Sequence, residues 1–156
     1  MCPASANARE SVWDYPRPPR VEPSSEHVVL RLGGRVLADS RRALRVLETS
    51  HPPTYYIPVA DIDMSRLSRG AGTSWCEFKG AAAYWDADGD PAIGWSYPEP
   101  ARGFELLRDH IAFYPARVEA TVDGEPVLPQ PGGFYGGWIT SRVSGPFKGA
   151  PGTSGW

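Results

Sequence analysis

Three two-residue turns constrain the fold of this chain more than any other feature of its sequence. Gly33-Gly34, Asp88-Gly89 and Asp123-Gly124 each separate two runs that are rich in apolar residues. Gly-Gly and Asp-Gly pairs permit the positive φ angles that tight β-hairpins require. The runs that they join are 27–32 with 35–39, 81–87 with 91–97, and 118–122 with 125–128. Three such hairpins in 156 residues predict a mainly β fold made of antiparallel sheets.

Helix signals are fewer and shorter. Residues 100–111 place Phe104, Leu107 and Ile111 at helical spacing, and Pro100 suits a first helical position. A short turn of helix is also expected over 61–67. Residues 40–48 fit two interpretations, because Ser40 could cap a helix while Leu44, Val46 and Glu48 alternate as in a strand. The apolar positions lean slightly toward a helix, so one or two short helices are expected beside the sheets.

Composition divides the chain into three parts. Residues 1–25 form an N-terminal tail and a Pro-rich arm, 26–128 a β-rich core domain, and 129–156 a Gly-rich and aromatic C-terminal segment. Trp13 and Tyr15 are expected to anchor the arm to the core, although a free linker that binds a partner's aromatic groove is the alternative. The C-terminal segment is expected to wrap over the sheet, with disorder as the alternative.

Charge and hydropathy exclude several classes of protein. The 16 basic and 18 acidic residues nearly cancel, which disfavours nucleic acid or an anionic membrane as the main partner. The sequence has no apolar run long enough to cross a membrane and no apolar N-terminal run typical of a secretory signal, so a cytoplasmic location is expected. The two cysteines and three histidines lie too far apart for a structural zinc site, and whether the chain uses a cofactor is unknown from the sequence. A homodimer is left open.

Lysine is unusually scarce in this chain. There are 14 arginines but only two lysines, Lys79 and Lys148, and both lie in the tetrapeptide Phe-Lys-Gly-Ala. Codon bias and chance give one explanation. The other is that a primary amine is needed at one or both positions, because lysine can lose its proton when buried and act as a nucleophile.

The run 75–80 is the first candidate for chemistry. On a regular strand, Trp75, Glu77 and Lys79 share one face, and Cys76 lies on the other. If the Lys79 face meets solvent, Cys76 is an inert core thiol. If it lines a pocket, desolvation favours a neutral amine that could act as a base or form a Schiff base. Cys76 and Lys79 then share a site only if a bulge intervenes, which Gly80 could supply.

Further candidates lie on neighbouring segments. Glu48 ends an apolar run and is either a solvated edge residue or a buried functional carboxylate. His51 precedes two prolines in an expected loop, where it is either a surface residue or a proton carrier. Tyr56 could supply an inward hydroxyl. Trp85, Trp95 and Tyr97 lie on the second hairpin, where they either fill the core or form an aromatic pocket wall.

Four runs resemble the family catalogued as domain of unknown function 427. They are Leu-Glu-Thr-Ser-His-Pro-Pro-Thr-Tyr-Tyr-Ile-Pro (47–58), Trp-Cys-Glu-Phe-Lys-Gly (75–80), Trp-Ser-Tyr-Pro-Glu-Pro (95–100) and Ile-Ala-Phe-Tyr-Pro (111–115). The resemblance covers about 26–128 and implies a β-tent-like arrangement of antiparallel sheets with a pocket between them. Relatives of that architecture often hold zinc with four cysteines, which this chain lacks.

The same family carries a nucleotidyltransferase label, which the residues support poorly. Nucleotidyl transfer needs carboxylates for Mg²⁺ and donors for phosphates. A nucleotidyltransferase fold usually places an Asp-x-Asp pair about a dozen residues after a Gly-Gly or Gly-Ser turn. Here Asp61 and Asp63 lie more than twice as far from Gly33-Gly34, which is better explained as a hairpin turn.

Together these features predict a small-molecule-binding, potentially catalytic pocket between β-sheets. Its catalytic residues would be Glu48 and Lys79 as an acid–base pair, Tyr56 as an orienting hydroxyl and Cys76 as a neighbouring thiol. Its ligand-binding residues would be Trp95, Tyr97, His51 and Trp85. The alternatives are a non-catalytic protein-interaction or dimerisation module, which would use the arm and the C-terminal segment, and the nucleotidyltransferase of the family label.

Overall fold

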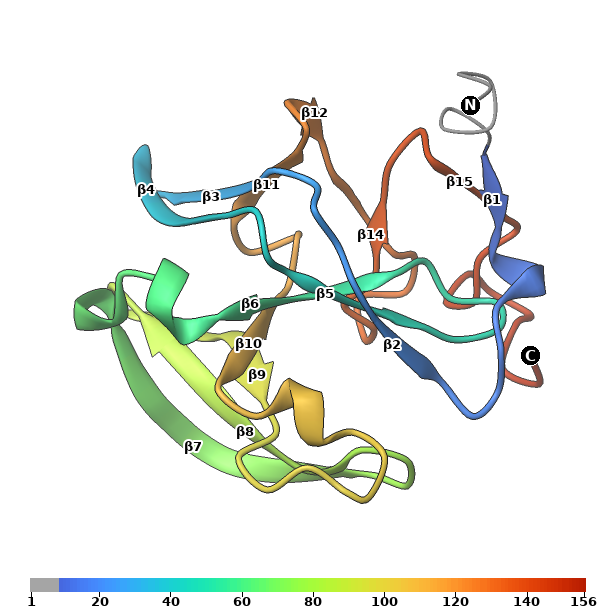
Figure 1. Cartoon of the computed structure of the whole chain (residues 1–156), viewed down its shortest axis with the longest axis horizontal. Coiled ribbons are helices and arrows are strands. Elements are labelled where there is room, and N and C mark those ends of the chain that lie inside the picture. Colours follow the sequence, from blue (N-terminus) through green and yellow to red (C-terminus); the bar gives the residue numbers. More distant parts are fainter. Residues whose placement is uncertain (1–8) are drawn as a thin grey trace.

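The computed structural model describes residues 9–156 (Figure 1). Residues 1–8, with Cys2, lie outside the described part. The first strands are β1 (Glu10–Ser11), β2 (Arg20–Pro23), β3 (Val28–Leu32), β4 (Arg35–Ser40), β5 (Leu44–Leu47), β6 (Thr54–Pro58), β7 (Leu67–Cys76) and β8 (Gly80–Ala87). The others are β9 (Asp90–Ser96), β10 (His110–Phe113), β11 (Glu119–Val122), β12 (Glu125–Pro126), β13 (Leu128–Pro129), β14 (Trp138–Ile139) and β15 (Val143–Ser144). Four single 3-10 turns complete the described elements: η1 (Val12–Asp14), η2 (Val59–Asp61), η3 (Met64–Arg66) and η4 (Glu105–Leu107).

Two antiparallel sheets make up most of the molecule. The larger has seven strands in the order β2-β5-β6-β10-β9-β8-β7, and the smaller has four in the order β12-β11-β3-β4. Figure 1 shows β3, β4 and β11 on one side of the larger sheet, with β7, β8 and β9 farthest from them. The predicted mainly β, antiparallel fold class is therefore confirmed.

The three predicted hairpins form as β3–β4, β8–β9 and β11–β12. Asp88 and Asp123 have φ angles of 49°, and the glycine after each has a φ above 80°. Two-residue hairpin turns require such positive φ angles, and Asp-Gly pairs adopt them readily. The short sequence signal was sufficient because a hairpin of this length is determined locally.

The helix expected over 100–111 does not form. The segment contains only the single turn η4, after which β10 begins at His110. Gly103 and Asp109 have φ angles of 94° and 60°, which a right-handed helix does not accommodate. The apolar spacing has another cause, because Phe104 and Leu107 pack on one face of the larger sheet and Ile111 packs on the other.

Residues 40–48 also differ from the slight preference for a helix. They contain β5, which pairs with β2 on one side and β6 on the other. All four residues of β5 are buried, because the strand has protein on both faces. Such a strand shows a nearly continuous apolar run, which periodicity does not distinguish from a buried helix. The helical turn expected over 61–67 is η3, capped by the Asp63 carboxylate, and the long strand β7 follows it.

The larger sheet separates two hydrophobic clusters. The first lies between the two sheets and includes Leu30, Ile57, Ile93, Phe113 and Trp138. The second lies on the opposite face of the larger sheet and includes Val46, Tyr56, Trp95, Tyr97 and Leu107. Alternation along β6 and β9 assigns neighbouring residues to opposite clusters, as for Tyr55 and Tyr56.

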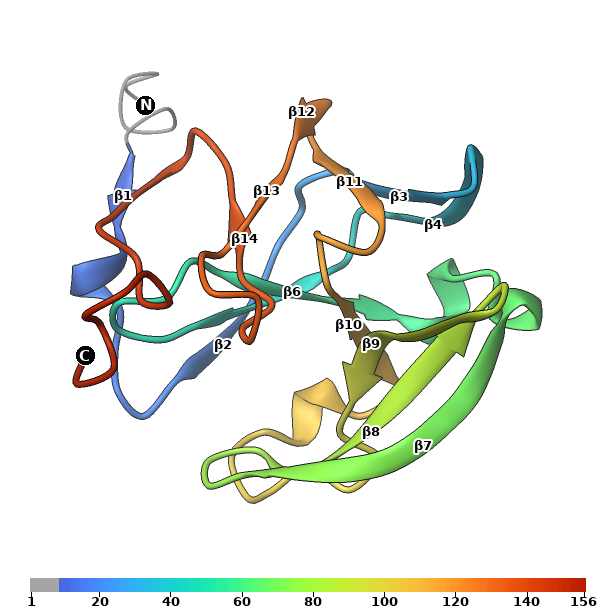
Figure 2. The same cartoon turned by 180° about the vertical axis from the view of Figure 1, so that it is seen from behind.

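Both ends of the described chain pack onto the core. The arm contributes β2 to the larger sheet, and Tyr15 is buried in a third small cluster with Val12 and Leu47. In the C-terminal segment, Trp138 is fully buried, stacks on Tyr55 and donates its indole N–H to the Phe113 carbonyl at 3.0 Å. The strands β1 and β15 pair in parallel, and Figure 2 shows the described N-terminal residues beside the C-terminal segment.

A buried ion network ties the arm to the sheet. Arg45 is only 1 % exposed, and its guanidinium donates to the carboxylates of Glu10 and Glu22. Arg142 from the C-terminal segment donates to Glu10 and pairs with Glu26. We call these five residues the Arg45 network. It joins three chain segments that are distant in sequence.

Within the described residues, no helix has the length and hydrophobicity needed to cross a membrane.

Candidate functional site

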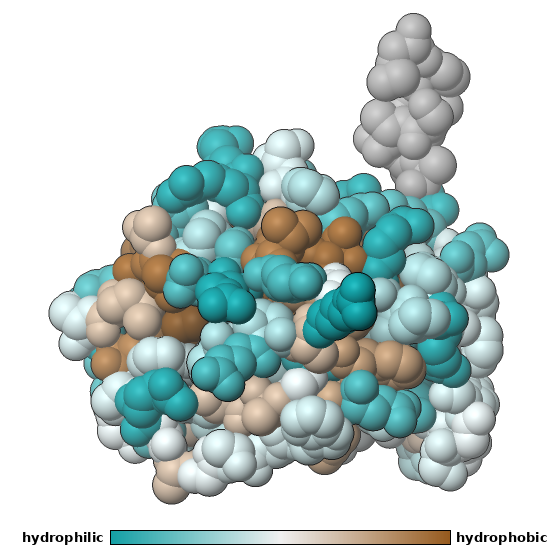
Figure 3. Space-filling model, turned by 60° about the horizontal axis from the view of Figure 1, so that its bottom comes forward, coloured by the Kyte–Doolittle hydropathy of each residue, from teal (hydrophilic) through white to brown (hydrophobic). Residues whose placement is uncertain are grey.

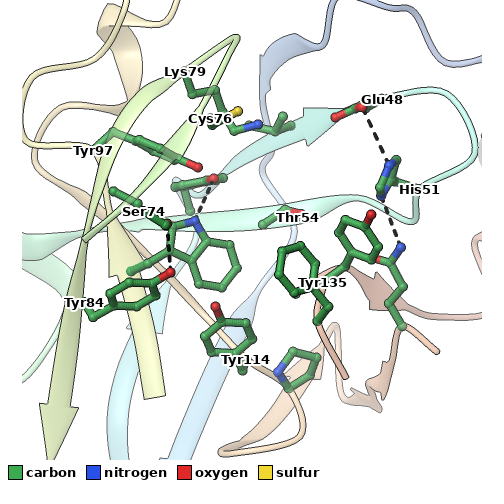
Figure 4. A pocket seen from close by; sticks show the side chains of 18 of the residues that line it. Glu48, His51, Thr54, Ser74, Cys76, Lys79, Tyr84, Tyr97, Tyr114 and Tyr135 are labelled. Atoms are coloured by element: carbon green, nitrogen blue, oxygen red, sulfur yellow. Dashed lines mark hydrogen bonds and ion pairs between the residues drawn. The ribbon is translucent and has the colours of Figure 1, made fainter. Parts of the chain in front are cut away.

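A cavity of about 670 Å³ lies on the second-cluster face of the larger sheet (Figure 4). Its walls come from strands β5 to β9, the turn that follows β7, the segment after β10, and residues 129–136 with Lys148. No residue of the four-stranded sheet lines it. The cavity therefore does not lie between the seven-stranded and four-stranded sheets, where the residues of the first cluster pack together. The cavity lies instead between one sheet and the C-terminal segment.

Seven of the eight predicted site residues line this one cavity. They are Glu48, His51, Tyr56, Cys76, Lys79, Trp95 and Tyr97. Trp85 does not line it. Trp85 packs against the first cluster, donates its indole N–H to the Ser96 hydroxyl at 2.9 Å and carries the Arg69 guanidinium over its ring. Its position on β8 is one residue from Tyr84, which does face the cavity.

Lys79 and Cys76 reach the same cavity because the strand ends between them. The expected alternation through 75–80 is wrong: β7 ends at Cys76, residues 77–79 form a turn, and Cys76 pairs with Gly80 across it. Gly80 has a φ of 108°, which favours glycine. A turn thus performs the role that we expected of a bulge. Figure 4 shows Lys79 and Cys76 together on one side of the cavity.

Aromatic side chains form the floor of the cavity. Tyr56 is 1 % exposed and accepts a hydrogen bond from the Trp95 indole N–H at 3.3 Å. Tyr114 lies against Trp95 with 4.6 Å between ring centroids, and Tyr97 lies 6.3 Å from Tyr56. Burial raises the pKa of both Tyr56 and Tyr97, so their hydroxyls stay protonated at neutral pH. The floor is therefore a neutral surface of π faces and a few hydroxyl groups.

Glu48 and His51 form the polar wall. The Glu48 carboxylate lies 3.6 Å from the His51 Nε2 and 3.6 Å from the Arg17 guanidinium. Among residues 9–156, no ion pair joins Glu48 to Lys79. Figure 4 shows Glu48 and His51 across the cavity from Cys76 and Lys79. The carboxylate therefore pairs with a histidine and an arginine rather than with the amine that we expected.

Gln130 determines the protonation state of His51. Its amide oxygen accepts the Gly137 N–H at 3.1 Å, and its amide nitrogen donates to the Lys148 carbonyl at 2.8 Å, which fixes the amide orientation. The same nitrogen lies 3.1 Å from the His51 Nδ1, so Nδ1 must accept. His51 is then neutral, and its proton is on Nε2, toward Glu48. Burial, opposed by Glu48 and assisted by nearby cations, lowers the pKa of His51, which agrees with this assignment.

A family model described as "Domain of unknown function (DUF427)" matches residues 20–124. The chain belongs to this family. No curated protein matches the chain.

The family's label refers to nucleotidyl transfer, but the Asp61 carboxylate is held by Arg42 and Ser40, and Asp63 caps η3 through Ser65. Neither residue lines the cavity. Within the described part of the chain, no group of three or more His, Cys, Asp and Glu residues is placed to hold a metal ion.

The cavity extends beyond the part of the chain that matches the DUF427 model. Gln130, Tyr135 and Lys148 lie outside 20–124, and the sequence analysis did not include them in the site. Tyr135 packs edge-on against His51 with 4.9 Å between centroids. A Cβ atom at Gly136 would lie 2.2 Å from the Trp95 ring, so only glycine allows this close approach. Lysine scarcity was the one sequence signal that pointed to Lys148.

Proposed function

We propose that this DUF427 protein binds a small molecule in the cavity between the larger sheet and the C-terminal segment, and that Glu48, His51 and Lys79 act on it. The observation that carries the proposal is the convergence of these groups on one aromatic-walled cavity. Its volume of about 670 Å³ falls within the range of about 300–1,000 Å³ typical of small-molecule sites. Such sites combine apolar walls with a few fixed polar groups, as this one does.

The polar groups suggest acid–base chemistry. Glu48 is the group that we propose as proton acceptor, because it faces the cavity with a neutral His51 beside it that can donate from Nε2. Lys79, on the opposite wall, would supply an amine to stabilise negative charge or attack a carbonyl carbon. The Tyr56 hydroxyl would orient Trp95, and the Cys76 thiol would lie beside the reacting amine.

A thermal-shift screen against a metabolite and nucleotide library tests the proposal. A ligand that binds only the native state raises the unfolding temperature. We expect at least one hit whose shift is lost in Lys79→Ala or Glu48→Ala. Arg69→Ala is the matched control, since Arg69 is a cation stacked on Trp85 of the same hairpin but outside the cavity. Its hits should equal those of the wild type.

Two outcomes would contradict the proposal in different ways. A hit that survives both Lys79→Ala and Glu48→Ala would show that the ligand binds elsewhere. A library that produces no shift, in a protein whose unfolding is cooperative, would remove the small-molecule function itself.

The rival function, a protein-interaction module, is less well supported. It would leave an apolar patch on the arm and the C-terminal segment. Of the most exposed large apolar side chains in the described residues, only Trp13 and Phe134 belong to the arm and the C-terminal segment; the others are Val36, Trp75, Leu106 and Leu128. On the face drawn in Figure 3, hydrophobic residues lie in small groups among hydrophilic ones.

A further inference from the structure

Both lysines of the chain line the same cavity. Lys79 comes from the turn after β7, and Lys148 comes from the C-terminal segment, 69 positions later. Each ammonium group lies over the ring of a tyrosine on the wall: Lys79 Nζ is 5.9 Å from the centroid of Tyr97, and Lys148 Nζ is 5.7 Å from that of Tyr135. Two residues that are rare in the sequence are thus placed alike on an aromatic surface.

Neither lysine forms an ion pair with an Asp or Glu side chain within residues 9–156. The Lys148 Nζ donates to the main-chain oxygen of Trp156, the last residue of the sequence, at 3.3 Å. Many arginines, by contrast, are held in ion pairs, among them Arg17, Arg42, Arg45, Arg66 and Arg142. Both lysines are half-buried, so their charges are only partly solvated. Together with Arg117, they are the lining cations that no Asp or Glu side chain pairs with in the described part of the chain.

The two ammonium groups reach the cavity from different walls: Lys79 lies over Tyr97, and Lys148 lies over Tyr135, which packs on His51. The pKa of His51 is lowered chiefly by burial, and Lys148 and Lys79 both lower it further, against the opposing effect of Glu48. Arg117 adds a third positive charge to the wall, while the Glu48 carboxylate is already paired with Arg17. Against these three cations the lining holds the carboxylates of Glu48 and Glu77, so its charged side chains sum to +1, although the whole chain has a formal charge of −2.

We infer that Lys79 and Lys148 together bind the anionic group of a small planar ligand, a carboxylate or a phosphate, whose ring lies on the aromatic floor. This inference rests on the proposed function and names the class of ligand. Ammonium groups bind such anions through charge-assisted hydrogen bonds. The surface of Trp95, Tyr97 and Tyr114 offers π faces on which a ring can stack.

Calorimetric titration with three matched probes tests the inference: 1-naphthoate, 1-naphthyl phosphate and the neutral 1-naphthamide. We expect at least one anion to bind about tenfold or more tightly than the amide, since a hydrogen bond to a charged group contributes that much. The tighter of the two anions identifies the carboxylate or the phosphate class. Its affinity should fall as salt rises from low to high concentration.

Variants connect the binding to the two lysines. Lys79→Gln and Lys148→Gln should each weaken the better anion about tenfold or more and leave 1-naphthamide unchanged. The conservative Lys79→Arg and Lys148→Arg keep the charge and should keep most of the affinity. Arg69→Gln, outside the cavity, should bind like the wild type. Urea midpoints of all variants separate a binding loss from a folding loss.

Each other result is decisive. If 1-naphthamide binds as tightly as the anions and the lysine variants bind normally, the anion site is wrong but the small-molecule function survives. If only one lysine matters, the joint site is wrong. If none of the three probes binds, the ligand class is wrong, and the library screen alone then decides the proposed function.

Discussion

Replacing Arg45 with methionine should cost the protein a large part of its stability. The Arg45 side chain is 2 % exposed, and its guanidinium makes four hydrogen bonds to Glu10 and Glu22, at 2.5 to 3.3 Å. Removing one member of a buried ion pair typically costs about 3–5 kcal/mol, because the remaining charge is stranded. Glu10 keeps Arg142 and Tyr15, and Glu22 keeps Arg20, so we expect the lower end, about 3 kcal/mol.

Equilibrium unfolding in urea measures this loss. The free energy of unfolding should fall through the midpoint while the slope stays constant. Since small domains have about 5–15 kcal/mol in total, the variant should remain folded but marginal. Arg42→Met is the control: Arg42 also pairs with a carboxylate, that of Asp61, but its side chain is 66 % exposed, so its loss should be much smaller.

A second variant isolates the stranded charge. Adding Glu22→Gln to Arg45→Met removes one of the two carboxylates that lost Arg45, so the double variant should be more stable than Arg45→Met alone. If Arg45→Met costs no more than Arg42→Met, or if the double variant is no more stable than Arg45→Met alone, the reasoning from burial is refuted.

Three further predictions concern the C-terminal segment and the titrating groups. Trp138→Ala should lower the free energy of unfolding, measured in urea, by about 3–5 kcal/mol, because the indole is fully buried. Trp75→Ala, at a side chain that is 74 % exposed, should leave it nearly unchanged, and equal losses would contradict the packing of Trp138. Burial raises the pKa of Glu10, but the hydrogen bonds from Tyr15 and Arg45 outweigh it and hold the pKa below 4.5. The stabilisation from this carboxylate is therefore present above about pH 4.5 and is lost as the pH falls through the lower folded value. The difference in stability between wild type and Glu10→Gln should close in acid, and a constant difference would exclude this linkage. Because the folded pKa of His51 lies below 6.5, the unfolded chain takes up that proton first, and stability falls as the pH drops below 6.5. The ¹⁵N spectra should show the Nε2-protonated ring at neutral pH, and Gln130→Glu, which replaces the amide donor with a carboxylate, should raise the pKa of His51. An Nδ1-protonated ring in the wild type would overturn the role of Gln130.

The hairpins were predictable from sequence because their determinants are local. Asp88-Gly89 sets the conformation of its turn whatever surrounds it, and its register follows from the loop length. The elements that were predicted wrongly depend on what lies around them. Residues 44–47 are a strand because β2 and β6 flank them, and nothing within 40–48 reveals that. Phe104 and Ile111 share a helical spacing but pack on opposite faces of a sheet.

The residues of the candidate site also differ in how far the sequence alone could reveal them. Glu48, Lys79 and Trp95 were found because their residue types are unusual for their local context. Gln130 was not, because a glutamine in a Gly-rich stretch carries no signal until its amide is seen between Gly137, Lys148 and His51. Trp85 was included wrongly, since strand alternation separates two faces but does not say which one borders a cavity.

The C-terminal segment that closes the cavity has a consequence for how such a protein diversifies. The floor belongs to the sheet, whereas Gln130, Tyr135 and Lys148 are supplied by a stretch beyond residue 124 that inserts one indole into the core. Loop replacements on either side of the buried Trp138 would change the part of the cavity wall that the C-terminal segment supplies, without altering any strand of the larger sheet. A graft of a different stretch between Gln130 and Trp138 is thus a direct route to new ligand preferences on an unchanged scaffold.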